Sequence, residues 1–145
     1  MVGNTSSAKD LAIKIADWAT DREQLTDIRR LVFVEEQKVP EDMEWDEFDN
    51  SSIHFLATQE DQAVACARLK PDGQIGRMAV LPLYRNRGIG KRLLHFILQI
   101  AEQKHIDRLY LHAQVSAIPF YEKLGFTAGG EVFYEAGIPH REMTK

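Results

Sequence analysis

A strand–turn–helix–strand segment in the middle of the 145-residue chain constrains its fold more than any other feature. Residues 74–81 are predicted to form a strand that stops at Pro82, because proline cannot continue a hydrogen-bond ladder. Residues 88–105 are predicted to form a helix, since apolar side chains recur at helical spacing at Ile89, Leu93, Leu94, Phe96, Ile97, Ile100 and Ala101. Residues 108–114 are predicted to form the next strand. A strand–helix–strand connection joins parallel neighbours, so part of the sheet is expected to be parallel.

The remaining elements are shorter and complete a mixed sheet. Strands are predicted at residues 11–15, 53–58, 63–69, 126–134 and 140–144, and a short helix at residues 117–124. The turn-like residues 59–62 predict an antiparallel hairpin. Another helix is predicted from Thr20 or Asp21 to a point before Pro40, with one buried stripe at Leu25, Ile28, Leu31 and Val32. The expected fold class is α/β (α+β), a central mixed β-sheet flanked by helices in the order β-α-β-β-β-α-β-α-β-β.

Composition favours a single domain and argues against several functional classes. Without repeats or linker-like stretches, residues 1–145 are expected to form one domain with residues 1–8 frayed. The net charge of −4 argues against a general nucleic-acid or anionic-membrane binder. Because no targeting segment and no run of 18 apolar residues is found, we expect a cytoplasmic protein with no membrane partner. Cys66, the single cysteine, excludes an internal disulfide and a CxxC-type zinc site, so no metal is expected.

Positive charge is concentrated in residues 77–92, which contain five basic side chains and no carboxylate. Gly88 and Gly90 permit a tight turn whose backbone N–H groups converge at the start of a helix, where the helix dipole favours an anion. The segment fails the Walker pattern, because Arg85 stands at its first glycine, and the dinucleotide pattern, because Leu93 stands at its third. The segment therefore predicts either a phosphate-binding turn or an ordinary helix start with a solvated basic face.

Two motifs resemble the GNAT superfamily of N-acetyltransferases. The first is Arg85-x-x-Gly88-x-Gly90 after a strand that ends Met78-Ala-Val80, and it is similar to the acyl-CoA signature of that superfamily. The second is Gln114-Val-Ser-Ala-Ile-Pro-Phe-Tyr-Glu-Lys-Leu-Gly-Phe126. The resemblance covers roughly residues 11–144 and implies a GNAT-like sheet. The flanking segments Val32–Pro40 and Glu135–His140 resemble those of the small bacterial ElaA/YjcF-type branch.

The resemblance implies acetyl-CoA as cosubstrate and assigns residues to it. The backbone of Met78, Ala79 and Val80 would pair with the pantetheine arm, and the Val80 N–H would polarise the thioester carbonyl. Backbone N–H groups would hold the pyrophosphate, contributed by Arg85, Asn86, Arg87, Gly88, Ile89, Gly90 and Lys91. Gln114 stands where the superfamily more commonly has asparagine, which leaves its contact with the cofactor open.

The resemblance also places Tyr121 at the position of the general acid that protonates the leaving thiolate. The alternative for Tyr121 is a packed aromatic beside Phe120. Many members carry a glutamate on the fourth strand as general base, but residues 76–80 contain no carboxylate. The candidates for the base are Glu36, His112 and His140, or a water relay between them.

The segment of residues 35–49 holds eight carboxylates against one lysine. It is interpreted either as a solvated acidic loop or as an electrostatic funnel for a cationic amine. Under the second interpretation the substrate-binding residues are Glu36, Glu44 and Asp46.

The sequence thus predicts an N-acetyltransferase that transfers an acetyl group directly from acetyl-CoA to a primary amine, with a small-molecule amine as its partner. The alternatives are a non-catalytic acyl-CoA-binding sensor or interaction module and, more distantly, a nucleotide-binding protein. The two final strands are also able to pair across a homodimer.

Overall fold

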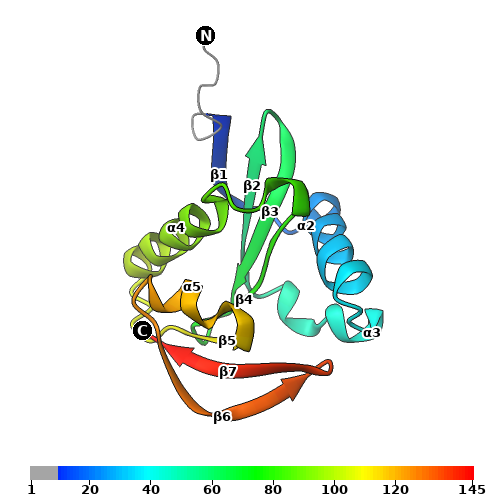
Figure 1. Cartoon of the computed structure of the whole chain (residues 1–145). Helices are drawn as coiled ribbons and strands as arrows, with labels where there is room; N and C mark the ends of the chain where they lie inside the picture. The colour runs from blue at the N-terminus through cyan, green and yellow to red at the C-terminus, as the bar shows by residue number, and fades with distance from the viewer. Residues whose placement is uncertain (1–9) are drawn as a thin grey trace.

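Seven strands form one continuous sheet in the computed structural model, which describes residues 10–145. The strands are β1 (Leu11–Ala16), β2 (Ile53–Gln59), β3 (Gln62–Leu69), β4 (Gln74–Val80), β5 (Tyr110–Gln114), β6 (Thr127–Glu135) and β7 (Ile138–Thr144). Their order in the sheet is β1-β2-β3-β4-β5-β7-β6 (Figure 1). Within the described residues β4 and β5 pair in parallel and all other neighbours are antiparallel. The predicted mixed sheet is therefore confirmed, whereas the predicted fraying of residues 1–8 lies outside the described residues.

Helices cover both faces of the sheet. They are α2 (Arg22–Arg29), the π-helical turn η1 (Arg30–Glu36), α3 (Glu41–Glu44), α4 (Ile89–Gln103) and α5 (Ile118–Glu122). Three 3₁₀ turns lie between them, η2 (Glu47–Asp49), η3 (Pro82–Tyr84) and η4 (Val115–Ala117). In Figure 1, α4 lies on one side of the central strands and α2 on the other.

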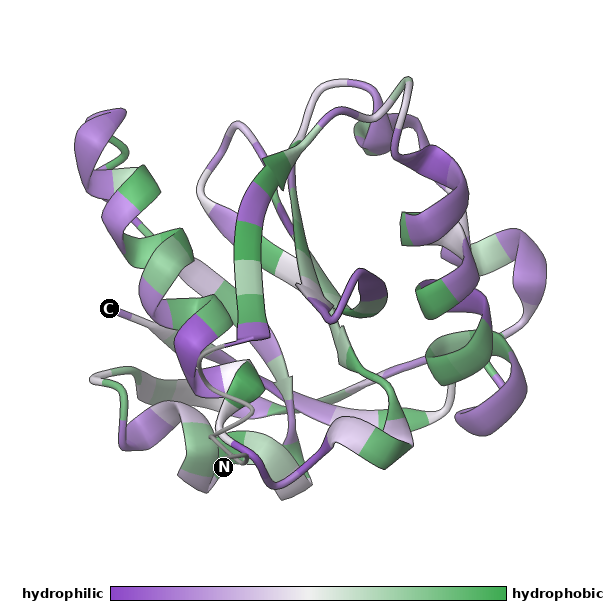
Figure 2. Ribbon diagram, turned by 90° about the horizontal axis from the view of Figure 1, so that it is seen from above, coloured by the Kyte–Doolittle hydropathy of each residue, from purple (hydrophilic) through white to green (hydrophobic). Residues whose placement is uncertain are grey.

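Two hydrophobic clusters fill the space between the sheet and these helices. Side chains alternate between the faces of a strand, so Phe55 of β2 packs in the cluster beneath α4, while Leu56 packs in the cluster beneath α2. Leu94 and Ile97 of α4 are fully buried in the first cluster. Figure 2 shows green hydrophobic and purple hydrophilic residues alternating along the helices, as expected when one helix face packs on a sheet.

The predicted stripe of the first helix is wrong at one residue. Leu25, Ile28 and Val32 are buried, but Leu31 is 46% exposed. The regular α-helix ends at Arg29 and continues as a π-helical turn, in which the Gln37 N–H donates to the Val32 carbonyl five residues back. The buried residues Leu25, Ile28 and Val32 keep the three- and four-residue spacing of one helix face, whereas Leu31 lies off that face and is exposed.

Strands β4 and β5 diverge soon after they meet. Their register contains two pairs, Gln74 with Tyr110 and Ile75 with Leu111. Beyond them β4 bulges against β3, and Arg77 takes a positive φ of 50°. A bulge bends its strand, so the second half of β4 turns away from β5 and leaves an edge that β5 does not cover.

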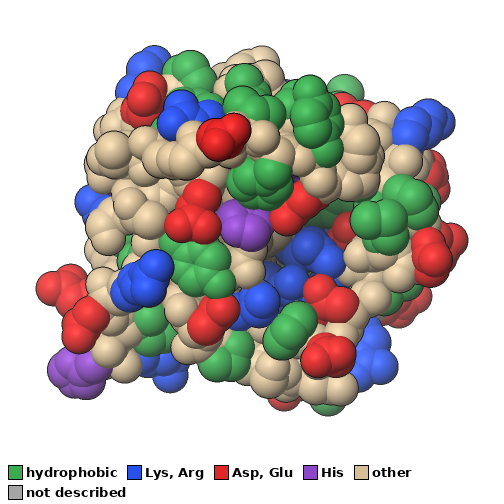
Figure 3. Space-filling model, turned by 90° about the horizontal axis from the view of Figure 1, so that it is seen from below, with side chains coloured by type: hydrophobic (Ala, Val, Ile, Leu, Met, Phe, Trp, Pro, Cys, Tyr) green, Lys and Arg blue, Asp and Glu red, His purple; other side chains and the backbone are tan. Residues whose placement is uncertain are grey.

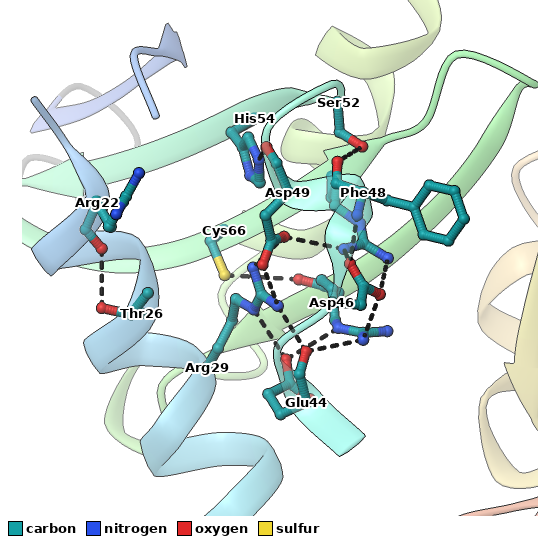
Figure 4. A network of polar contacts seen from close by, with 12 residues as sticks. Arg22, Thr26, Arg29, Glu44, Asp46, Phe48, Asp49, Ser52, His54 and Cys66 are labelled. Carbon is teal, nitrogen blue, oxygen red and sulfur yellow. Dashed lines mark hydrogen bonds and ion pairs between the residues drawn. The ribbon is translucent and has the colours of Figure 1, made fainter. Parts of the chain in front are cut away.

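A ring of alternating arginines and carboxylates, buried except at Asp46 and Arg77, fixes the acidic segment to the sheet (Figure 4). Its members are Arg29 of α2, Arg68 of β3, Arg77 of β4, Glu44 of α3, and Asp46 and Asp49 at the ends of η2. Arg29 contacts Glu44 at 2.8 Å and Asp49 at 2.9 Å. Arg68 contacts Asp49 at 2.9 Å and Asp46 at 2.7 Å, and Arg77 closes the ring to Asp46 at 3.1 Å and to Glu44 at 3.0 Å.

Because most of the ring is buried, the stability of the fold depends on its charges being paired. Arg29 and Glu44 are 1% and 3% exposed. Desolvation raises the pKa of Glu44, although Arg77 and Arg29 act in the opposite direction. Desolvation also acts to raise the pKa of Asp46, but the hydrogen bond and charge of Arg68 prevail and lower it. Glu44 and Asp49 belong to a packed core, whereas Asp46 is partly exposed at the cavity. The interpretation of this segment as a solvated loop is therefore wrong for Glu44 and Asp49.

Cys66 lies directly against this ring. Its thiol is buried and donates to the Arg77 carbonyl at an Sγ–O distance of 3.5 Å. Desolvation raises the pKa of Cys66 to about 12, so the thiolate is not formed at neutral pH.

Removing one member of the ring should cost far more stability than removing its neighbour in sequence. Arg29→Met leaves Glu44 and Asp49 short of a cation in a buried site, and we expect a loss of about 3–5 kcal/mol in the free energy of unfolding. Arg30→Met is the matched control, because Arg30 pairs with Glu41 at the exposed surface and its loss should change stability little. Urea denaturation measures both variants, and equal losses would contradict a structural role for the ring.

Candidate active site

A cavity of about 660 Å³ lies where β4 and β5 separate. Its walls come from η1, from the segment that carries Glu44 and Asp46, from α5, and from the turn between β6 and β7. Figure 3 shows this face of the molecule hollowed, with Lys and Arg side chains on the floor and a histidine at the rim. The charged and histidine side chains of the lining are Glu44, Asp46, Arg68, Lys70, Arg77, His112, Glu135 and His140.

The turn at residues 86–88 leaves backbone N–H groups at the start of α4 free to bind an anion. Asn86 and Gly88 take positive φ values of 63° and 80°, and Gly88 is the N-cap of α4 without a side-chain cap. The first helical bond in this turn runs from the Arg92 N–H to the Gly88 carbonyl, so the preceding N–H groups of the helix have no intrahelical partner. Asn86, Arg87, Gly88 and Lys91 are exposed, while the Ile89 side chain is buried in the core.

The end of β4 directs backbone groups into the opening. The Leu81 N–H donates to the Val64 carbonyl of β3 at 2.9 Å. Successive N–H groups of an extended chain point to opposite edges, so the Val80 N–H points away from β3 and toward the gap left by β5. On that side the Val80 carbonyl accepts from Arg85 Nε at 2.8 Å.

Arg85 connects this strand to η1. Its two terminal nitrogens bind the Glu36 carboxylate at 2.7 and 2.6 Å. The hydrogen bond from Arg85 lowers the pKa of Glu36, so Glu36 is a weak proton acceptor. Arg85 thus holds η1 against the end of β4, and its guanidinium is already engaged by protein groups.

Tyr121 of α5 faces β4 from the other wall of the opening. Its ring packs edge-to-face against Phe120 at 5.0 Å and Phe126 at 6.1 Å. Its hydroxyl lies 3.9 Å from the Met78 sulfur on β4. Desolvation raises the pKa of Tyr121 to about 12, which keeps the phenol protonated and able to donate. Tyr121 therefore both packs with Phe120 and presents a hydroxyl to the opening.

Glu135 brings the two candidate histidines together. His112 Nδ1 lies 3.0 Å from Glu135 Oε2, and His140 Nε2 lies 3.9 Å from Glu135 Oε1. His140 Nδ1 lies 2.6 Å from the Ile138 carbonyl, which only accepts, so this nitrogen carries the proton. In the neutral ring the lone pair therefore resides on Nε2, the nitrogen that faces Glu135.

The comparisons with known proteins agree with this geometry. A model of the GNAT acetyltransferase domain matches residues 20–145. The chain belongs to the GNAT acetyltransferase family.

Its relatives include small bacterial proteins of the predicted branch. The N-acetyltransferase YjcF of Bacillus subtilis is 35% identical over 134 residues, which cover 88% of this chain and 96% of YjcF. Protein ElaA of Escherichia coli is 35% identical over 129 residues, which cover 83% of this chain and 84% of ElaA. The crystal structure of ElaA superposes with a TM-score of 0.84 at 28% identity and covers 93% of this chain and 99% of its own.

The third relative is named by its activity. The crystal structure of an acyl-CoA N-acyltransferase from Pseudomonas aeruginosa superposes with a TM-score of 0.82 at 33% identity, and it covers 94% of this chain and 98% of its own. Together these relatives confirm the predicted family and the GNAT-like sheet.

The remaining predicted residues of this GNAT site are placed as follows. Gln114 lies on the cavity wall and donates to Gln37 of the segment after η1 at 2.9 Å. Glu44 and Asp46 line the cavity, but both carboxylates are held by arginines of the ring, which argues against the predicted funnel. The sequence does not predict the role of Glu135 beside the two histidines, although the segment Glu135–His140 contains it.

Two further findings concern the described residues as a whole. No helix between residues 10 and 145 is long and apolar enough to cross a membrane. Over the same residues no group of three or more His, Cys, Asp or Glu side chains is placed to hold a metal ion.

The tautomer of His140 can be tested without any substrate. In the neutral ring we expect the proton on Nδ1, because that nitrogen contacts the Ile138 carbonyl. His54 is the internal control with the opposite tautomer, since its Nε2 lies 2.8 Å from the Asp49 carbonyl. Nitrogen-15 NMR of the two rings distinguishes them, and a proton on Nε2 of neutral His140 would contradict the assignment.

Proposed function

We propose that this GNAT protein is an N-acetyltransferase that moves an acetyl group directly from acetyl-CoA to a primary amine. The observation that carries the proposal is the open edge of β4. Its Met78 lines one cavity with Tyr121 and His140, and two residues further along the strand Val80 lies beside Gly90 in the first turn of α4, whose N-cap has no side-chain partner. The description of the Pseudomonas aeruginosa relative as an acyl-CoA N-acyltransferase supports the choice of cosubstrate.

The residues present fit coenzyme A. The start of α4 offers unpartnered backbone N–H groups at the positive end of a 15-residue helix, next to the exposed side chains of Arg87 and Lys91. The free edge of β4 at Met78, Ala79 and Val80 is suited to pair with an extended amide-containing arm. An acetyl thioester bound there supplies an electrophilic carbonyl.

The reaction forms a bond between the amine nitrogen and the carbonyl carbon and breaks the bond from that carbon to sulfur. The Val80 N–H stabilises the negative charge that develops on the carbonyl oxygen. An ammonium group loses two protons when it becomes an amide. His140 Nε2 accepts the first, and the second replaces, through solvent, the proton that Tyr121 gives to the sulfur. The Tyr121 hydroxyl donates to the sulfur as it leaves, and no residue forms a covalent bond with the acetyl group.

Removal of a proton from the substrate ammonium group is the step that needs the most help from the protein. An alkylammonium group has a pKa of about 10.4, so its neutral form costs about 4.6 kcal/mol at pH 7. His140 is favoured over Glu36 for this role, because Glu36 is engaged by Arg85 while His140 has its Nε2 lone pair on the cavity side. Glu135 lies close enough to stabilise the imidazolium that forms.

The alternative of a non-catalytic acyl-CoA sensor rests on the absence of a carboxylate from residues 76–80 of β4. His140 supplies a proton acceptor from another strand, which removes the need for that carboxylate. The hydroxyl of Tyr121 facing β4 also favours an enzyme, since a sensor has no leaving group to protonate.

The first test is a calorimetric titration of the protein with acetyl-CoA, CoA and ATP. We expect micromolar binding of acetyl-CoA and of CoA, and much weaker binding of ATP. Gly88→Val should abolish most of this binding, because residue 88 takes a φ of 80° that a β-branched side chain resists. No binding of acetyl-CoA to the folded wild type would overturn the proposal, and tighter binding of ATP would favour a nucleotide-binding protein.

The second test separates the two proposed proton transfers by their pH dependence. Tyr121→Phe should lower kcat by at least tens-fold while acetyl-CoA affinity is retained, and this loss should persist across pH 6–9 because the pKa of Tyr121 is about 12. His140→Gln should lose most at pH 7 and recover as the pH rises, since more of the amine is then already neutral.

Amine-dependent release of CoA measures both variants against the wild type. No amine-dependent release from a protein that binds acetyl-CoA would favour the sensor. A fully active Tyr121→Phe variant would remove Tyr121 from the mechanism.

A further inference from the structure

The acidic segment of residues 35–49 predicts a negatively charged cavity, but the charges that line the cavity are balanced. Three carboxylates of that segment are matched by three arginines in the ring, so the ring carries no net charge. The charged lining residues that remain outside the ring are one cation, Lys70, and one carboxylate, Glu135. The cavity is therefore dipolar rather than negative.

Lys70 keeps its charge available to a ligand. Within residues 10–145 no carboxylate forms an ion pair with it. Its Nζ instead donates to Gln74 Oε1 at 3.1 Å and lies 3.9 Å from the centre of the Phe48 ring. The charge of Lys70 contributes to the lowered pKa of Asp72, but the two side chains form no ion pair. The Asp72 carboxylate instead accepts a hydrogen bond from the Tyr110 hydroxyl at 2.6 Å.

The two charges terminate one row of polar side chains along the cavity wall. Gln74, the partner of Lys70, has its Nε2 3.5 Å from His112 Nδ1. The same nitrogen lies 3.0 Å from Glu135 Oε2, so His112 Nδ1 donates to Glu135 and only approaches Gln74. The row thus runs from a cation at the β3–β4 end to a carboxylate beside His140, the proposed acceptor of the amine proton.

We propose that the acetyl acceptor is an amino acid type of molecule, a primary amine that also bears a carboxylate. Its ammonium group is recognised by Glu135 and deprotonated by His140, and its carboxylate is recognised by Lys70. This inference rests on the proposed function and names the substrate class of the same site. The rest of the lining suits an apolar body between the two charges, because it includes Phe33, Val39, Met43, Ile75, Leu111 and Ile138.

The same charges disfavour a polyamine. Its second ammonium group would lie near Lys70, where like charges repel in a partly desolvated cavity. A plain alkylamine avoids this repulsion but leaves Lys70 without a partner. The expected order of acceptors is therefore amino acid first, alkylamine second and diamine last.

Matched acceptors test the proposal. One set consists of 6-aminohexanoate, hexylamine and 1,6-diaminohexane, which share a chain length and differ in the charge of the second group. For each compound kcat/KM is measured by CoA release at saturating acetyl-CoA. 6-Aminohexanoate should exceed hexylamine, and hexylamine should exceed 1,6-diaminohexane.

Variants of Lys70 then attribute this preference to one side chain. Lys70→Met should lower the ratio of kcat/KM for the amino acid to that for its matched amine by about tenfold, the size expected for one charge-assisted hydrogen bond. Lys70→Arg should retain the preference. Lys104→Met, which removes an exposed lysine beyond the end of α4, is the control and should leave the ratio unchanged. Because the ratio compares two acceptors on one protein, a general loss of activity cancels.

The outcomes separate the two proposals. If amines or diamines are preferred, or if Lys70→Met leaves the ratio unchanged, the amino acid assignment is wrong while the acetyltransferase activity stands. If no compound releases CoA from a protein that binds acetyl-CoA, amine acetylation and the acceptor class both fail. A ratio that falls in Lys70→Met and persists in Lys70→Arg supports the assignment.

Discussion

The largely buried ring of three arginines and three carboxylates determines much of the structure around it. It joins α2, α3, β3 and β4 through directional bonds, so it fixes where the acidic segment lies as well as how tightly it is held. Arg77 joins the ring from the bulged part of β4, the part that turns away from β5. The interactions that hold the acidic segment and the opening that admits a ligand are therefore parts of one arrangement. Apolar side chains of equal volume would fill the same space, but they would not specify these directions.

The two halves of the site are built differently. The half assigned to acetyl-CoA consists mostly of backbone, namely the edge of β4 and the first turn of α4. The half assigned to the acceptor consists of side chains from elements distant in sequence, such as Lys70, His112 and Glu135. A backbone site needs glycine and a strand end at fixed spacing, whereas a side-chain site can be altered by single substitutions. We expect the acceptor to vary among GNAT chains more readily than the cosubstrate.

This difference also explains what could be predicted from the sequence. The order of strands and helices, the hairpin at residues 59–62 and the glycine turn follow from local patterns, and the structure has them. The π-helical turn could not be predicted, because the side chains of residues 30–36 carry no signal that distinguishes it from an α-helix. The ring could not be predicted either, since it pairs residues between 15 and 33 positions apart. The sequence pattern therefore assigns Glu44 to the substrate, whereas the structure pairs it with Arg29 and Arg77.

The position of Cys66 gives the protein a built-in reporter. It is the single thiol of the chain, it is fully buried, and it lies against the backbone of Arg77. A thiol reagent reaches it only when the packing around the ring opens, so the labelling rate of the native protein measures that opening. The same protection means that a chromogenic thiol reagent detects CoA promptly and the protein slowly. In one sample, the fast reaction of the reagent with CoA therefore reports CoA release, and its slow reaction with Cys66 reports local unfolding.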